Sequence, residues 1–88
     1  MDEKLQKIVD YLNELKTRCT YGAVADVLDV NPKNIGAYLG ERRPEVSWIV
    51  NSKTHEPTDY LDAEKHPDLY RTGRVISSAE VLRRNLGL

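Results

Sequence analysis

Features that mark membrane-bound and secreted proteins are missing from this 88-residue chain. No apolar run approaches the roughly 18 residues that a membrane-spanning helix needs, so we expect no membrane partner. The first residues, Met1 to Lys4, are acidic and polar, which predicts no secretory signal. The one cysteine, Cys19, can form no internal disulfide, and this favours a reducing environment. We therefore expect a cytoplasmic protein.

Groups of residues that carry catalysis or bind metals are also missing. The two histidines, His55 and His66, do not stand with Cys19 at spacings typical of a zinc site. Cys19 has Arg18 as a neighbour but no histidine close in sequence, so a half-buried structural thiol is favoured over a nucleophile. No Ser-His-Asp set, phosphate-binding loop or paired-carboxylate site stands out. The sequence thus predicts no enzyme, no metal, no cofactor and no small-molecule substrate.

The net charge is small, at −1, which disfavours nucleic-acid binding because many nucleic-acid-binding proteins are plainly basic. The distribution of charge weakens that objection. Between Pro32 and Thr54 the acids are Glu41 and Glu45, and the bases outnumber them. These bases are Lys33, Arg42, Arg43 and Lys53. Because the local field steers a charged ligand more than the total charge does, this segment stays a candidate nucleic-acid surface.

Residues 20–40 organise the rest of the chain, which we expect to form one domain over residues 1–88. Val24, Val27 and Leu28 lie three and four positions apart and so share one face of a helix. Thr20 is a suitable N-cap for that helix, because its hydroxyl can accept a free backbone N–H.

A second short helix is predicted directly after Asn31, a capping residue that precedes Pro32 at the first helical position. Ile35 and Leu39 give this helix an apolar face. Gly40 ends it, because glycine adopts a left-handed conformation at little steric cost. Two short helices joined so tightly must cross, which is the helix-turn-helix geometry.

Helices are also predicted at both ends of the chain. An apolar stripe over residues 2–16 predicts a first helix. Ser77 and Glu80 have the spacing of a capping box and open a last helix that runs through Leu86. A short strand is expected just before it, at residues 75–76.

A β-hairpin is predicted after the second helix. Residues 46–51 are rich in β-branched and aromatic residues, with Trp48 more typical of core than of a ligand platform. Turn-forming residues follow, and residues 54–60 could return as a second strand, interrupted at Pro57. The predicted fold is therefore α+β, mainly α: a three-helix winged helix-turn-helix with a small β-hairpin wing and a C-terminal helix.

The run T-Y-G-A-V-A at residues 20–25, followed by K-N-I-G-A-Y-L at residues 33–39, resembles the DNA-binding half of the O6-alkylguanine-DNA alkyltransferases and the alkyltransferase-like proteins. Members of that family carry T-Y-G-x-[IVL]-A and, later, R-x-[VI]-G-x-[AL]-[LM]. A P-[CW]-H-R-V-[VI] segment follows in the family, and E-V-S-W-I-V at residues 45–50 takes that place here. The resemblance covers about residues 17–55 and implies a winged-helix domain that binds DNA.

The resemblance also implies roles for single residues. Tyr21 matches a tyrosine that presses on the phosphate beside a flipped nucleotide, and Lys33 replaces an arginine that fills the space left by the base. Lysine lacks the planar guanidinium, which disfavours base flipping. Val46 stands where the family has its reactive cysteine or tryptophan, and Ser47 stands where it has a histidine. If the alignment is shifted so that Trp48 takes the tryptophan position, the histidine is again missing. The resemblance, without the cysteine and the histidine, therefore implies DNA binding without alkyl transfer.

We assign the DNA contacts to the start of the second helix and to the loops beside it. Asn31, Lys33 and Asn34 lie in its first turn, where helix-turn-helix proteins reach bases and phosphates. Tyr38, one turn later, is expected to reach sugar or base, or to rest on the wing. The contacts to phosphates are assigned to Tyr21, Arg42, Arg43 and Lys53.

Non-catalytic binding of double-stranded DNA is therefore the favoured function, and two alternatives stay open. A protein-interaction domain on a winged-helix scaffold fits the negative net charge. A sensor of modified bases in DNA repair, as in the alkyltransferase-like proteins, fits the resemblance. The same residues also allow plainer roles: Tyr21 can pack at a helix start, and Asn31 and Lys33 can form a capped, solvated helix end.

Overall fold

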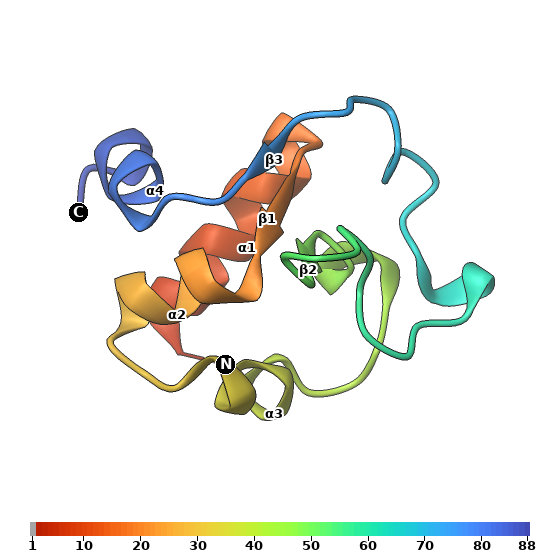
Figure 1. The fold of residues 1–88 in the computed structure, drawn as a ribbon, viewed down its shortest axis with the longest axis horizontal. Coiled ribbons are helices and arrows are strands. Elements are labelled where there is room, and N and C mark those ends of the chain that lie inside the picture. Colours follow the sequence, from red (N-terminus) through yellow and green to blue (C-terminus); the bar gives the residue numbers. More distant parts are fainter. Residues whose placement is uncertain (1) are drawn as a thin grey trace.

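The computed structural model describes residues 2–88 as an α+β fold with four α-helices and a small parallel sheet. The helices are α1 (Glu3–Leu15), α2 (Tyr21–Leu28), α3 (Ile35–Leu39) and α4 (Ala79–Leu86). The strands are β1 (Arg18–Thr20), β2 (Ile49–Val50) and β3 (Val75–Ile76). Single 3-10 turns also occur, named η1 (Pro32–Asn34), η2 (Pro44–Val46) and η3 (Asp62–Glu64). Figure 1 shows α3 at the bottom of the molecule and α4 at its upper left.

Side-chain caps fix the helix starts in the middle of the chain, as the sequence predicts. The Thr20 hydroxyl accepts a hydrogen bond from the Ala23 N–H at 3.2 Å and so opens α2. The Asn31 side chain accepts from the Lys33 N–H at 2.9 Å, but the first turn after it is η1, and α3 follows directly. Gly40, with φ of 76°, ends α3 as expected.

The two terminal helices are confirmed, with one change of cap. Helix α1 buries most of its predicted apolar stripe, but Leu15 at its end is exposed. In α4 the capping hydroxyl belongs to Ser78, which accepts from the Val81 N–H at 3.4 Å, so the predicted cap at Ser77 is wrong by one residue. Leu82 is fully buried beneath this helix, whereas Val81 is exposed.

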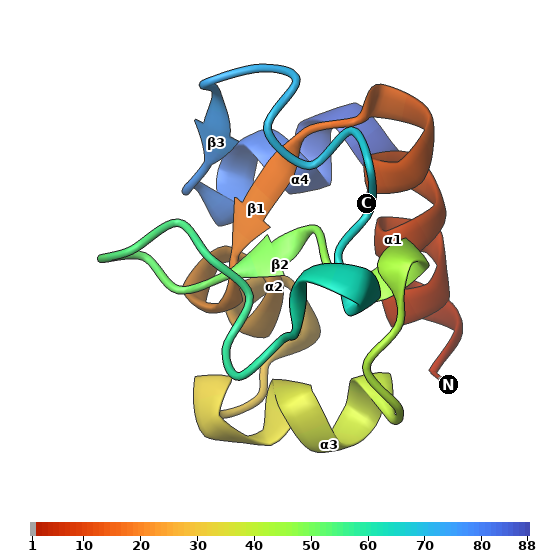
Figure 2. The ribbon, with the colours of Figure 1, turned by 90° about the vertical axis from the view of Figure 1, so that its right-hand side faces the viewer.

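The sheet differs from the prediction. Residues 18–20, for which no strand was predicted, form its central strand, and the strand order is β2-β1-β3. Both pairs are parallel: Cys19 lies opposite Ile49 in β2 and opposite Ile76 in β3. Figure 2 shows β3 and β2 on either side of β1. The expected strand at residues 75–76 is thus confirmed.

The prediction of a β-hairpin wing was wrong. Strand β2 covers only residues 49–50 and pairs with β1, and residues 54–60 contain no strand. Pro44 begins the η2 turn, which takes up residues expected to extend the strand. On the return, the Asn51 N–H donates to the Glu56 carbonyl at 2.9 Å and closes a turn, and Pro57 has no N–H to offer a ladder.

Trp48 is fully buried, which confirms its expected place in the core. Its indole Nε1 donates to Asn13 Oδ1 at 2.9 Å, and the Asn13 side chain donates in turn to the Glu45 carbonyl at 2.7 Å. The His66 ring packs on the indole with centroids 4.7 Å apart. The two hydrogen bonds of Asn13 hold the segment before β2 against α1.

Candidate nucleic-acid interface

A groove of about 830 Å³ lies between two stretches that are distant in sequence. We call residues 21–42 its helical wall, which includes the start of α2, then η1 and α3. Residues 51–60 form its loop wall. The side chains that give the groove its chemistry are Tyr21, Lys33, Arg42, Asn51, Thr58 and Tyr60. None of the described residues that line it is acidic, so the groove suits an anionic ligand.

Two tyrosines line the groove, one from each wall. The Tyr21 hydroxyl accepts a hydrogen bond from the Thr58 N–H at 3.4 Å, which ties the two walls together. Burial raises the pKa of Tyr60, and the nearby Tyr21 raises it further, against the lowering influence of the Arg43 backbone and the Arg42 charge. Tyr60 therefore keeps its proton at neutral pH and can donate a hydrogen bond. Both rings also offer flat faces for stacking.

The two cations of the groove differ in how far they are neutralised. Lys33 is exposed and has no ion pair among the described residues 2–88. Arg42 Nη2 lies 3.9 Å from Asp59 Oδ2, and both side chains are at least half exposed. An ion pair so exposed is worth under about 1 kcal/mol, so a phosphate can displace Asp59 from Arg42.

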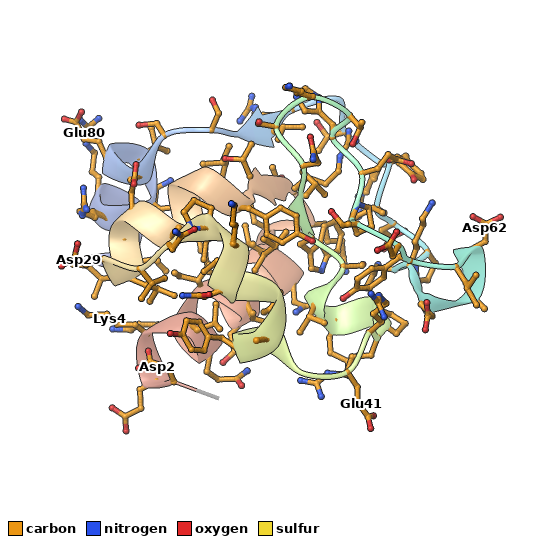
Figure 3. The ribbon with its side chains drawn as sticks, turned by 60° about the horizontal axis from the view of Figure 1, so that its bottom comes forward. Asp2, Lys4, Asp29, Glu41, Asp62 and Glu80 are labelled. Atoms are coloured by element: carbon orange, nitrogen blue, oxygen red, sulfur yellow. The ribbon has the colours of Figure 1, made fainter. Side chains whose placement is uncertain are left out.

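The acids at the outer edge of the molecule point away from this region. Figure 3 looks toward α3, and the labelled acidic side chains project outward from the outline of the molecule. These are Asp2, Asp29, Glu41, Asp62 and Glu80. No acid is among the described residues that line the groove, although Asp59 pairs with Arg42 there, so the small net charge does not describe the groove itself.

The loop wall is fixed by its own turn and by one buried arginine. Asn51 Oδ1 accepts from the Lys53 N–H at 2.8 Å, and the His55 N–H donates to the Asn51 carbonyl at 2.7 Å. Arg18 of β1 then donates through Nη1 to the His55 carbonyl at 3.0 Å. Through Nη2 it donates to the Thr72 carbonyl at 3.1 Å. The wall is therefore held against the sheet before any ligand arrives.

Two glycines keep the groove open. Gly22 in α2 and Gly36 in α3 both line it, and a Cβ added at either would meet nothing within 4 Å. Neither glycine has a positive φ, so the backbone itself would accept a side chain at both places. The missing side chains leave empty volume, which a ligand can occupy.

The segment that resembles the reactive region of the alkyltransferases lies in the core. Val46, Ser47 and Trp48 are buried, and none of them lines the groove. The Ser47 hydroxyl donates to the Pro44 carbonyl at 2.7 Å and accepts from the His66 N–H at 2.9 Å. These bonds give Ser47 a structural role in joining η2 to the later loop.

Cys19 lies in the central strand and is fully buried, more deeply than the half-buried thiol that we expected. Burial raises its pKa to about 12, against the opposing influence of a backbone hydrogen bond at Thr20. The group stays a neutral thiol at neutral pH, and it lines no part of the groove.

Of the eight residues assigned to DNA, the structure places Tyr21, Lys33 and Arg42 together in the groove. Asn31 and Asn34 are exposed beside Lys33 but do not line it, and Lys53 lies exposed on the neighbouring turn. The other two, Tyr38 and Arg43, do not face this groove.

Tyr38 lines a second hollow of about 510 Å³ on another side of α3, beside Leu28 and Val30. The reason is helical geometry: Tyr38 follows Gly36 by two positions, which turns its side chain about 200° away. Arg43 is half-buried, and its Nε lies 3.3 Å from Glu45 Oε1. Tyr38 and Lys33 therefore lie on different faces of this segment, and the expected contact of Tyr38 with sugar or base stays a prediction.

Sequence reasoning missed most of the loop wall. Asn51 was expected at the end of a strand and start of a turn, Ser52 as a turn residue, and Thr58 and Tyr60 as part of a returning strand. The asparagine had a usable signal, since its side chain commonly bonds the backbone two residues on. Tyr60 had none, because nothing local brings it near Tyr21.

Comparison with models of protein families, with characterised proteins and with solved structures gives no significant match. No helix within residues 2–88 is both long enough and apolar enough to cross a membrane. In the same part of the chain, no three His, Cys, Asp or Glu side chains are grouped so that they could hold a metal ion.

Proposed function

We propose that this chain binds double-stranded DNA without catalysing a reaction, and that α2 and α3 act as the two helices of a helix-turn-helix. One observation carries the proposal: Tyr21, Lys33 and Arg42, three of the residues assigned to DNA, line one groove that has no acidic lining residue among those described. Lys33 and Gly36 lie three positions apart and present one face of η1 and α3 to that groove. A phosphate backbone is the ligand that such a face suits.

The test measures binding to a short fluorescent duplex by anisotropy at low salt. Lys33→Ala and Arg42→Ala should each weaken binding clearly more than Arg84→Ala, which removes the same charge from α4. With about four phosphate contacts, affinity should fall with salt at a log–log slope of about −3 to −4. Equal affinity for the three variants would contradict the assignment of this face. Capture of a protein, without retardation of duplex DNA, would favour a protein-interaction domain.

The second candidate is a sensor of modified bases, as the resemblance to alkyltransferase-like proteins implies. The groove favours it, since it combines open volume beside Gly22 and Gly36 with the rings of Tyr21 and Tyr60. An extrahelical base can stack on such rings. Duplexes with and without O6-alkylguanine distinguish the two functions: a sensor binds the modified duplex more tightly, and a general DNA-binding domain binds both alike.

Gly36→Leu makes that comparison sharper. Leucine fills the groove while it favours the helical conformation of α3 by about 1 kcal/mol relative to glycine. If a base enters the groove, this variant loses the preference for the modified duplex and keeps its thermal stability. Retention of the full preference would place base recognition outside the groove.

A further inference from the structure

We infer that a second cationic surface, at the edge of the sheet beside β3, extends the contact with DNA phosphates beyond the groove. The inference rests on the proposed function and adds residues that the helix-turn-helix does not include. We call this the β3 surface and define it by three exposed cations: Lys53, Arg71 and Arg74.

The β3 surface lies on the same side of the molecule as the groove. In Figure 2 the start of α3, the projecting turn of residues 51–56 and strand β3 all lie toward the left edge, and α1 lies at the right. Arg18 donates to the carbonyls of both His55 and Thr72, so the turn and the segment before β3 are held side by side. A duplex that lies along this side passes from the start of α3 to the turn of residues 51–56 and on to β3.

The cations of the β3 surface are not neutralised by the protein. Within residues 2–88, no carboxylate lies within 4.0 Å of the charged groups of Lys53, Arg71 or Arg74. Residues 69–79 contain no acid at all. Free cations of this kind release counterions when they meet phosphates, which is the main source of affinity for DNA.

The nearest acids are already engaged by other groups. Glu56 Oε1 accepts from the Tyr70 hydroxyl and lies 3.5 Å from Lys65 Nζ. Asp68 Oδ2 lies 3.6 Å from Lys16 Nζ. Their charges are therefore offset locally, which weakens their effect on the β3 surface.

A buried cation strengthens that field from behind. Arg18 is only 8% exposed, and its guanidinium donates hydrogen bonds to two carbonyls. The guanidinium carbon also lies over the Tyr70 ring, 5.3 Å from the ring centroid. Among the described residues, Arg18 forms no ion pair with a carboxylate. A charge held away from water is weakly screened, so it adds to the potential above Arg71 and Arg74.

The backbone also presents the two arginines in a fixed way. The Arg71 N–H donates to the Asp68 carbonyl at 3.0 Å, and the Arg74 N–H donates to the Thr72 hydroxyl at 3.2 Å. Their side chains make no hydrogen bond or ion pair within residues 2–88, so both guanidinium groups are free for a ligand. Little backbone ordering is then left for DNA binding to supply.

The test compares Arg71→Gln/Arg74→Gln with Lys4→Gln/Lys7→Gln, which removes the same charge from α1 at the opposite edge. At 50 mM salt, loss of the two arginines should weaken duplex binding about ten-fold or more and make the salt slope shallower by about 2. The lysine variant should leave the slope unchanged. Thermal unfolding checks that both variants are folded.

Each outcome decides a separate question. If the natural chain fails to bind duplex DNA at low salt, the proposed function and this inference both fail. If it binds and the arginine variant keeps the same slope, or if the lysine variant loses as much, the β3 surface is not a phosphate contact and the proposed function stands.

Amide shifts of the natural chain during titration with a 12-base-pair duplex give a second measurement. Residues 71–75 should shift together with residues 33–36, and their failure to shift overturns the inference.

Discussion

The two walls of the groove are built by different means. Contacts over short sequence distances fix the helical wall: Thr20 caps a residue three positions on, and Asn31 caps one two positions on. The loop wall depends on partners much farther away, since Arg18 reaches His55 and Tyr21 reaches Thr58, each across 37 positions. One wall can therefore form early from local structure, whereas the other needs the finished sheet.

This difference predicts that the walls respond differently when one contact is removed. Damage to a cap should weaken a helix and, with it, the whole fold. Damage to the long-range contacts should release the loop wall first, because residues 51–60 contain no helix or strand of their own. The variants below test this contrast, in order of expected effect.

Replacement of Arg18 by Met should have the largest effect, a loss of about 2 kcal/mol in the free energy of unfolding. Two charge-assisted hydrogen bonds are lost, each worth about 1.5–3 kcal/mol, and relief from burying a cation offsets part of that. Amide hydrogen exchange should rise in residues 51–56 and 70–74 before it rises in α1 and α2. Arg18→Lys is the matched control, since one ammonium cannot span both carbonyls as the guanidinium does. Uniform acceleration along the chain would contradict the contrast between the walls.

Replacement of Thr20 by Ala should cost about 1 kcal/mol, the usual value of a lost N-cap. Exchange should then rise first in α2 rather than in the loop wall. Thr20→Ser retains the capping hydroxyl and removes only the buried methyl group, so it should recover the cap. A loss that is equal in the Ala and Ser variants would show that the methyl group, and not the cap, stabilises this position.

The same contrast explains what the sequence could predict. The helices, the Thr20 cap of α2 and the end of α3 follow from residues within one turn of each other, and these predictions are confirmed, whereas the cap of α4 lies one residue later than predicted. Strand β1 was missed because three residues between two helices carry no periodic signal, and its partners lie 30 and 57 positions away. The hairpin failed for a related reason: Ile49 and Val50 suit a strand, but nothing local tells whether their partner is β1 or the residues that follow.

The candidate site divides in the same way. Tyr21, Lys33 and Arg42 could be found because they belong to the two predicted helices of residues 20–40 or follow them directly. Tyr60 and Thr58 could not, because only the folded loop brings them to Tyr21. Tyr38 lies outside this groove because the face of α3 that lines it carries Gly36 rather than the tyrosine.

The smallest expected effect concerns the ion pair that joins the two walls, between Arg42 and Asp59. Asp59 of the loop wall faces Arg42 of the helical wall and competes with any phosphate for it. Asp59→Asn should therefore raise the affinity for duplex DNA about two- to three-fold and leave stability within about 0.5 kcal/mol, since the exposed pair contributes little. Asparagine is the suitable replacement because position 59 has φ of 59°, a left-handed conformation that asparagine tolerates and alanine does not. Asp62→Asn removes the same charge from an exposed position outside the groove and is the control. Equal gains from both variants would mean that DNA senses only the total charge, and the loop wall would then have no part in setting the affinity of Arg42.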